Sequence, residues 1–207
     1  MCECQIRGVM CMNMVIRQEI LSLASNGVLL ASDVTNAGIH RGYISEMVSN
    51  GELVKASKGV YLLSDEIEDE YYLLQKRYSR GVFSHTTALY LLGYSDRVPL
   101  TPHLTFPAGY NSPSLQSANV LITRVSKENY GTGITTVTTS FGNAVQVYDL
   151  ERSLCDVLRG QGDDIQTIQS AFKKYALSNI KDINKLTSYA KQFRVGPKVR
   201  RYMEVLL

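Results

Sequence analysis

The chain has 207 residues, 44% of them hydrophobic and 20% charged, which is the composition of an ordinary globular protein. This length can bury a substantial core in one medium-sized domain or in two smaller ones. A net charge of +3 is too small to indicate a nucleic-acid partner by itself. No apolar run reaches the roughly 20 residues of a membrane span, so we expect a cytoplasmic protein with no membrane partner.

Basic residues gather near the carboxyl end of the chain. Residues 161–207 carry nine Lys or Arg and four Asp or Glu, whereas residues 1–63 carry five of each. Such clusters are often solvated surface, but their restriction to one region of an otherwise balanced chain favours an anionic partner. The predicted basic face consists of Lys173, Lys174, Lys181, Lys185, Lys191, Arg194, Lys198, Arg200 and Arg201.

Residues 1–13, "MCECQIRGVMCMN", predict a flexible leader, or residues upstream of a start at Met14. Three cysteines lie in this stretch, with no histidine nearby and no CxxC pair. A zinc site needs a fourth ligand at a workable spacing. The sequence therefore predicts no bound metal, and reduced thiols.

Residues 14–38 predict two helices around one short strand. Ile16, Ile20 and Leu23 stand at i, i+4 and i+7, the spacing of one helical face. The predicted elements are a helix from Met14 to about Asn26, a strand over 28–30 and a short helix over 33–37.

The next segment predicts a third helix and a hairpin. In the helix expected over 40–50, Ile44, Met47 and Val48 share one face, and Gly51 ends it. Residues 52–63 then alternate as two strands joined by a turn that contains glycine. This order predicts a winged helix-turn-helix DNA-binding domain over residues 14–63. The alternative is a small helical domain with an incidental hairpin.

The polar side of the third helix is the predicted DNA-contacting surface. Arg41 is the candidate for a guanine contact, because the start of this helix meets base edges in a helix-turn-helix. Glu46 either accepts a hydrogen bond from cytosine or repels phosphate. The alternative for the whole set is a solvated helix face. The predicted contacts are His40, Arg41, Gly42, Tyr43, Ser45, Glu46 and Ser49 on the helix, with Lys55 and Lys58 on the wing for phosphate or the minor groove.

Residues 64–80 begin acidic and end basic, as expected for a connector helix that complements its macrodipole. Residues 81–207 predict a second, α+β domain. Ser84 is placed to cap a helix, residues 97–148 predict three or four strands with a hairpin turn at 140–143, and Asp149 is placed to cap the helix that follows. The fold class is therefore α+β: a winged helix-turn-helix followed by a domain with a small sheet and about five helices.

Side chains capable of catalysis occur without a catalytic arrangement. His85, Ser153, Cys155 and Asp156 are not joined by any short motif, and Cys155 adjoins an apolar stripe where a small hydrophobe is expected. His103 lies inside a predicted strand, where an isolated histidine is usually half-buried. The sequence predicts no enzyme activity and no cofactor.

Three blocks carry a resemblance: "GIHRGYISEMVSNGELVKASKGVYLL", "FSHTTALYLLG" and "GNAVQVYDLERSLCDVLRG". In this order they resemble the AbiEi antitoxin family of transcriptional regulators. The resemblance implies a type IV toxin-antitoxin system of abortive phage infection. The N-terminal domain would repress its own operon by binding promoter inverted repeats, and residues 81–207 would carry the antitoxin activity.

The resemblance also implies a functional partner, a nucleotidyltransferase-like toxin that the antitoxin opposes without a stable complex. The alternative is a winged-helix repressor whose C-terminal domain senses a ligand or partner and has no antitoxin role.

Overall fold

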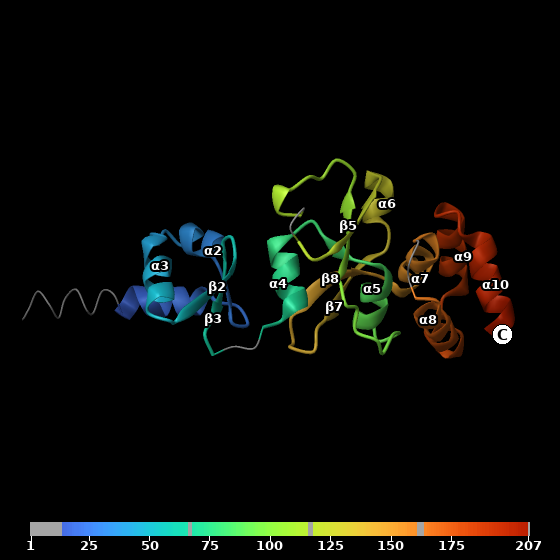
Figure 1. Ribbon diagram of the computed structural model, residues 1–207, viewed down its shortest axis with the longest axis horizontal. Helices are drawn as coiled ribbons and strands as arrows, with labels where there is room; N and C mark the ends of the chain where they lie inside the picture. Colours follow the sequence, from blue (N-terminus) through green and yellow to red (C-terminus); the bar gives the residue numbers. More distant parts are fainter. Residues whose placement is uncertain (1–13, 66–67, 116–117, 161–163, 207) are drawn as a thin grey trace, which may run out of the picture. The chain divides into compact units, whose positions relative to one another are not determined.

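The computed structural model describes residues 14–65, 68–115, 118–160 and 164–206. The predicted leader over residues 1–13 lies outside the described residues, as do residues 66–67 of the predicted connector. The chain divides into two compact units, Met1–Arg77 and Tyr78–Leu207, which are coloured by sequence in Figure 1.

The N-terminal unit has the element order of a winged helix-turn-helix. A helix over residues 14–23 precedes the other elements, and the three strands form one antiparallel sheet in the order β1-β3-β2. This arrangement confirms the predicted fold of the segment. The remaining elements are β1 (Val28–Leu30), α2 (Ala31–Asn36), α3 (Gly42–Ser49), β2 (Leu53–Ser57), β3 (Val60–Leu63) and α4 (Glu70–Arg77).

One apolar core holds the three helices and the sheet of this unit together. Ile20 of the first helix, Leu29 of β1, Val34 of α2 and Ile44 of α3 are each at most 1% exposed. At the end of α3 the chain reverses at Gly51, whose φ of 76° is a left-handed conformation that glycine adopts without penalty. The reversal brings the wing directly back onto the core.

The C-terminal unit contains a mixed five-stranded sheet in the order β6-β5-β4-β8-β7. The pairs β4–β8 and β5–β6 are parallel, and the pairs β4–β5 and β7–β8 are antiparallel. The strands are β4 (Val82–Phe83), β5 (His103–Pro107), β6 (Leu121–Val125), β7 (Ile134–Thr138) and β8 (Ala144–Tyr148). The helices are α5 (His85–Leu91), η1 (Pro113–Leu115), α6 (Lys127–Gly131), α7 (Leu150–Arg159), α8 (Ile165–Leu177), α9 (Ile183–Gln192) and α10 (Gly196–Leu206).

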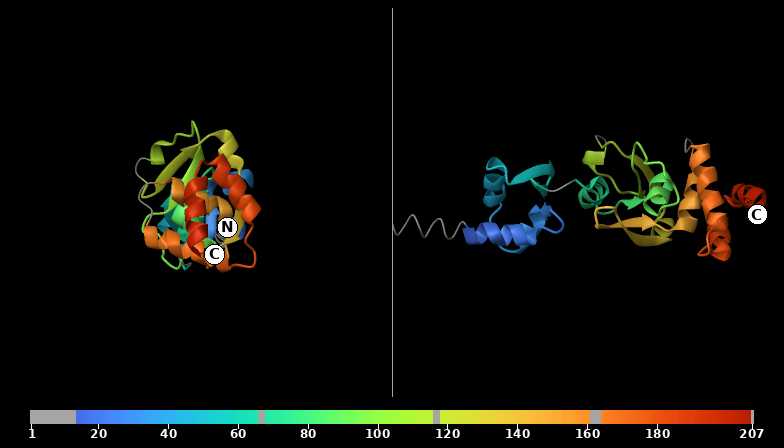
Figure 2. Two further views of the ribbon diagram at one scale, coloured as in Figure 1. Left: turned by 90° about the vertical axis from the view of Figure 1, so that its right-hand side faces the viewer. Right: turned by 90° about the horizontal axis from the view of Figure 1, so that it is seen from below.

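Helix α7 is the centre of this unit. It packs against α5, α8, α9 and α10, and Figures 1 and 2 show α7 to α10 gathered beside the sheet. Asp149 caps α7, as predicted, because its side chain accepts the backbone N–H of Arg152. Residues 150–158 are all buried, including the charged Glu151, Arg152 and Asp156.

The structure also departs from the predicted elements in detail. Strand β4 and helix α6 were not predicted, because two and five residues are too short to show a period. Helix α3 begins at Gly42 and not at His40, so Arg41 occupies its N-cap position. Ser84 holds the N-cap position of α5, but its side chain makes no cap hydrogen bond. Its hydroxyl group is engaged elsewhere, as described below.

Ile44→Ala should destabilise the N-terminal unit by about 2–4 kcal/mol, because it removes buried apolar groups and leaves a cavity in the core. Urea unfolding of the full chain, followed by a probe in this unit, measures the loss. The control is Ser45→Ala at the next, exposed position, which should change the free energy of unfolding by less than about 0.5 kcal/mol. Equal effects of the two changes would contradict the assigned core face of α3.

Candidate nucleic-acid interface

Helix α3 separates an apolar side from a polar side. Ile44 and Met47 are buried, whereas Ser45, Glu46 and Ser49 are exposed. Val48, expected in the core, is only partly buried. The Ser49 hydroxyl donates to the carbonyl oxygen of Glu46 at 2.7 Å, so it lies against its own helix. The structure therefore presents the predicted polar face to solvent.

Arg41 is held in place by helix α2. Its Nε donates to Thr35 Oγ1 at 2.7 Å, and Thr35 Oγ1 donates in turn to the carbonyl oxygen of Ala31 at 2.8 Å. These hydrogen bonds fix the orientation of the guanidinium group at the start of α3 in the absence of a ligand. Less side-chain entropy is therefore lost on binding. The sequence offered no signal for Thr35 in this role.

The neighbouring residues complete the start of α3. His40 Nδ1 accepts the backbone N–H of Gly42 at 3.1 Å, so His40 satisfies one of the free donors at the helix start. A Cβ atom at Gly42 would lie 2.8 Å from that same nitrogen. A larger residue at position 42 would therefore have to displace the exposed His40 ring and break this hydrogen bond. Tyr43 follows, with its side chain partly buried.

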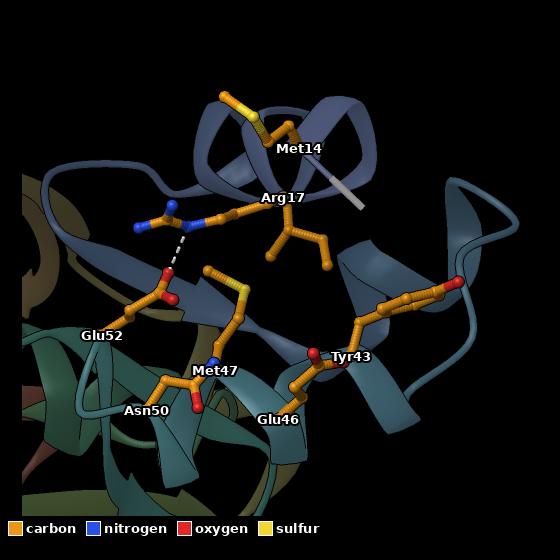
Figure 3. Close-up of a pocket in the computed structure, with 8 residues that line it drawn as sticks. Met14, Arg17, Tyr43, Glu46, Met47, Asn50 and Glu52 are labelled. Carbon is orange, nitrogen blue, oxygen red and sulfur yellow. Dashed lines mark hydrogen bonds and ion pairs between the residues drawn. The ribbon is translucent and has the colours of Figure 1, made fainter. Parts of the chain in front are cut away.

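A hollow of about 190 Å³ lies between α3 and the first helix, lined by Tyr43, Glu46, Met47 and Asn50 on the α3 side. Arg17 of the first helix lines the same hollow and pairs with Glu52 at 2.5 Å, as Figure 3 shows. Because Arg17 is already paired with Glu52, the charged residues that line the hollow, Arg17, Glu46 and Glu52, sum to −1, and Glu46 still repels phosphate here. Sequence reasoning missed Arg17, because it lies 29 residues before Glu46.

The wing carries its two lysines in the open. Lys55 lies in β2 and Lys58 in the turn before β3, and both are exposed. The pairing of β2 with β3 shifts between Lys55 and Ser57, so the strand bends next to Lys55. Both side chains remain available to an anion.

The nine residues of the predicted basic face fall into two groups. Lys181 Nζ donates to the carbonyl oxygen of Ala176, and Lys198 Nζ to that of Leu158. These bonds satisfy carbonyl oxygens in the last turns of α8 and α7, respectively. Lys174 lies 3.8 Å from Asp96, and Lys185 pairs with Asp149 at 3.1 Å and Glu151 at 3.4 Å. The exposed remainder consists of Lys173, Lys191, Arg194, Arg200 and Arg201.

Residues whose side chain types could act in catalysis are buried in the core of the C-terminal unit. Cys155 is buried, and burial raises the pKa of its thiol to about 12. Ser153 is also buried and donates to the carbonyl oxygen of Tyr148. These findings confirm that Cys155 acts as a small hydrophobe. In the part of the chain that the structure describes, no three side chains of His, Cys, Asp or Glu are grouped so as to hold a metal ion.

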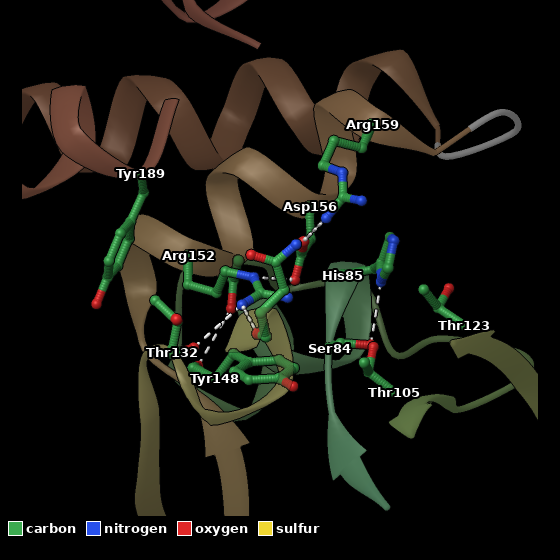
Figure 4. A network of polar contacts seen from close by, with 12 residues as sticks. Ser84, His85, Thr105, Thr123, Thr132, Tyr148, Arg152, Asp156, Arg159 and Tyr189 are labelled. Carbon is green, nitrogen blue, oxygen red and sulfur yellow. Dashed lines mark hydrogen bonds and ion pairs between the residues drawn. The ribbon is translucent and has the colours of Figure 1, made fainter. Parts of the chain in front are cut away.

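Two histidines that the sequence treated separately lie face to face. The rings of His85 and His103 stack with centroids 3.7 Å apart. His85 Nδ1 lies 3.0 Å from Ser84 Oγ, which accepts the Thr105 hydroxyl at 2.8 Å; Figure 4 shows these contacts. His103 Nε2 lies 2.8 Å from Thr123 Oγ1. Burial lowers the pKa of His85 to about 2 and that of His103 to about 4, so both rings are neutral.

The fold of this unit and the exposed polar side of α3 define a winged-helix protein. Residues 18–64 match a family model described as "Transcriptional regulator, AbiEi antitoxin". The match confirms the resemblance for the winged-helix segment, and it is to a family of regulators. It fits the expected roles of antitoxin, DNA-binding protein and transcriptional repressor in abortive infection.

No curated protein matches the chain. A solved structure, that of the RV2827C protein from Mycobacterium tuberculosis, is similar with a TM-score of 0.49 and 15% identity, over 92% of this chain and 79% of that one. Within the described ranges, no helix has both the length and the apolar character needed to cross a lipid bilayer.

Stability of the C-terminal unit should fall as the pH drops below about 6.5. Folding lowers the pKa of both histidines, so below pH 6.5 the unfolded chain binds protons that the folded chain does not bind. Above pH 6.5 the contribution of the two neutral histidines to the free energy of unfolding is fully present. Below this pH the free energy of unfolding declines by up to about 1.4 kcal/mol per pH unit for each histidine. The His103 share ends near pH 4, whereas the His85 share continues below it.

Urea unfolding of the full chain between pH 7 and pH 5, above most carboxylate titration, measures this slope. His85→Gln and His103→Gln should each flatten it. His40→Gln, in the other unit, is the matched control and should leave it unchanged. A slope that is the same in all three variants would show that these two rings do not carry the pH dependence.

Proposed function

We propose that the protein is an antitoxin of a type IV toxin-antitoxin system of abortive phage infection, which also represses its own operon by binding inverted repeats in the promoter. The observation that carries the proposal is the match of residues 18–64 to antitoxin regulators, on a segment whose α3 presents a polar face. The partner is a nucleotidyltransferase-like toxin, opposed without a stable complex. The described catalytic-type side chains, being buried, support a regulator and not an enzyme.

The charges of the winged helix suit it to reading a sequence more than to strong general attraction. Arg41 is pre-positioned by Thr35, and a fixed guanidinium can make two hydrogen bonds to guanine. Residues 1–63 carry no surplus of positive charge. We assign most of the non-specific attraction to the wing lysines and to the exposed basic residues of the C-terminal unit, which would act on phosphates.

A gel-shift assay with the upstream promoter DNA tests the regulatory part. Binding should be sequence-specific and weaken as salt is raised. Arg41→Ala should reduce the preference for the promoter over scrambled DNA by about 1–3 kcal/mol. Lys55→Ala and Lys58→Ala should weaken binding to both DNAs alike. Equal affinity of the unaltered protein for promoter and scrambled DNA would contradict operator recognition.

The contact between Thr35 and Arg41 gives a sharper test of the geometry. Thr35→Val keeps the shape of the side chain and removes the acceptor of Arg41 Nε. It should weaken promoter binding by about 0.5–1.5 kcal/mol, but have no further effect in an Arg41→Ala background. Thr35→Ser, which retains a hydroxyl group, is the control. Additive effects in the double variant would show that Thr35 does not act through Arg41.

Growth under toxin expression separates the proposal from a plain repressor with a sensing domain. The toxin is expressed from an unrelated promoter, together with the full chain carrying Arg41→Ala, Lys55→Ala and Lys58→Ala. Because this variant cannot act through the operon, restored growth shows antitoxin activity apart from repression. Failure of both this variant and the unaltered protein to restore growth would leave the repressor as the function.

A further inference from the structure

The buried Arg152 uses only part of its hydrogen-bonding capacity. Its side chain is 0% exposed. Nε donates to Asp156 Oδ2 at 2.8 Å, and Nη1 donates to the carbonyl oxygens of Asn129 and Thr132 at 2.7 and 3.1 Å. Nη2 is buried without a hydrogen-bond partner in the described part of the chain. Leaving a buried donor unpaired costs about 1–3 kcal/mol, and more for a charged group.

The guanidinium group cannot turn to pair Nη2 with another part of the protein. The rings of Tyr148 and Phe193 lie over it, with centroids 4.2 and 4.1 Å from the guanidinium carbon. The three bonds at Nε and Nη1 fix its rotation within the plane. A buried, charged donor fixed in this way points to an acceptor that comes from outside the chain.

A second guanidinium group lies beside the first. Arg152, Asp156 and Arg159 stand at i, i+4 and i+7 on α7, and therefore share one stripe. Arg159 Nη1 lies 3.5 Å from Asp156 Oδ1, and the Arg159 side chain is 33% exposed. One carboxylate thus serves two guanidinium groups. The three side chains together carry one net positive charge, and the partly exposed Arg159 connects the buried Arg152 and Asp156 to solvent.

Polar groups from α5 face this stripe. Helix α5 packs against α7, and Figure 4 shows His85, the first residue of α5, beside Asp156 and Arg159. The pKa of His85 is lowered first by burial and then by the charges of His103, Arg159 and Arg152. Helix α5 itself contains no Asp or Glu that could balance the excess charge. His103 Nδ1 is a second buried nitrogen without a partner among the described residues.

We propose that Arg152 and Arg159, with the adjacent His85 side chain, form a binding site for a phosphate group carried by a small ligand such as a nucleotide. Guanidinium groups bind oxyanions through parallel, charge-assisted hydrogen bonds. The donors come from both ends of α7 and face α5, so they approach from different directions. A phosphate group, whose oxygens radiate tetrahedrally, meets such donors better than a planar carboxylate does. The site is separate from the operator surface and does not depend on it.

Calorimetric titration of the full chain at constant ionic strength tests the site, with inorganic phosphate, AMP and ATP as probes. Saturable one-site binding is expected for at least one probe. Arg159→Gln should weaken it about tenfold or more, since a charge-assisted hydrogen bond is lost. Lys191→Gln, which removes an exposed charge of α9, is the control and should leave the affinity unchanged. Because Arg152→Gln threatens the fold, Arg152 is followed by the NMR signal of its Nε–H, which should shift on titration.

The outcomes separate the sources of the phosphate. Equal affinity for all three probes supports a site for the phosphate group alone, whereas tighter binding of AMP or ATP supports a nucleotide. Absence of saturable binding overturns the proposal. So does binding that Arg159→Gln leaves unchanged, or that Lys191→Gln weakens equally, since either result assigns the anion to the general basic surface.

Discussion

The C-terminal unit is organised around one buried cation. The Arg152 guanidinium group joins the carbonyl oxygens of Asn129 and Thr132, on and after α6, to Asp156 of α7. On its two faces lie the rings of Tyr148, from the end of β8, and Phe193, from the end of α9. Four segments thus meet at one charge. A buried ion is tolerated only when its partners are in place, so the cation requires this arrangement of sheet and helices.

A second network extends from the same helix. Lys185 of α9 pairs with Asp149 and Glu151 at the start of α7, and Tyr175 of α8 donates to Glu151 at 3.3 Å. These contacts fix α8 and α9 against the end of α7 that Asp149 caps. Lys185 therefore has a structural part in a region whose other cations are largely exposed. The contacts with DNA phosphates that we propose for this unit would be made mainly by those exposed side chains.

In the N-terminal unit, a small core decides which side chains are offered to a ligand. Burial of Ile44 and Met47 fixes the rotation of α3, and Thr35 fixes the direction of Arg41. This division suits a DNA-reading helix, since precise placement of a few donors supplies specificity while phosphate contacts supply affinity. The match to antitoxin regulators covers residues 18–64 of this unit, which include α3 and the wing.

Periodicity in the sequence was sufficient to predict the winged-helix order, the α+β class and the hairpin that turns at 140–143, because burial of one face repeats along a regular element. It also placed Asp149 at a cap and Cys155 in the core. It could not predict β4, whose two residues pair with strands distant in sequence, nor the engagement of Ser84 with Thr105. The stacking of His85 on His103, the seating of Arg41 on Thr35 and the burial of Arg152 between two rings were decided only by the tertiary structure. Local spacing determines which face of an element is apolar, but the partner of a polar side chain depends on where the rest of the chain folds.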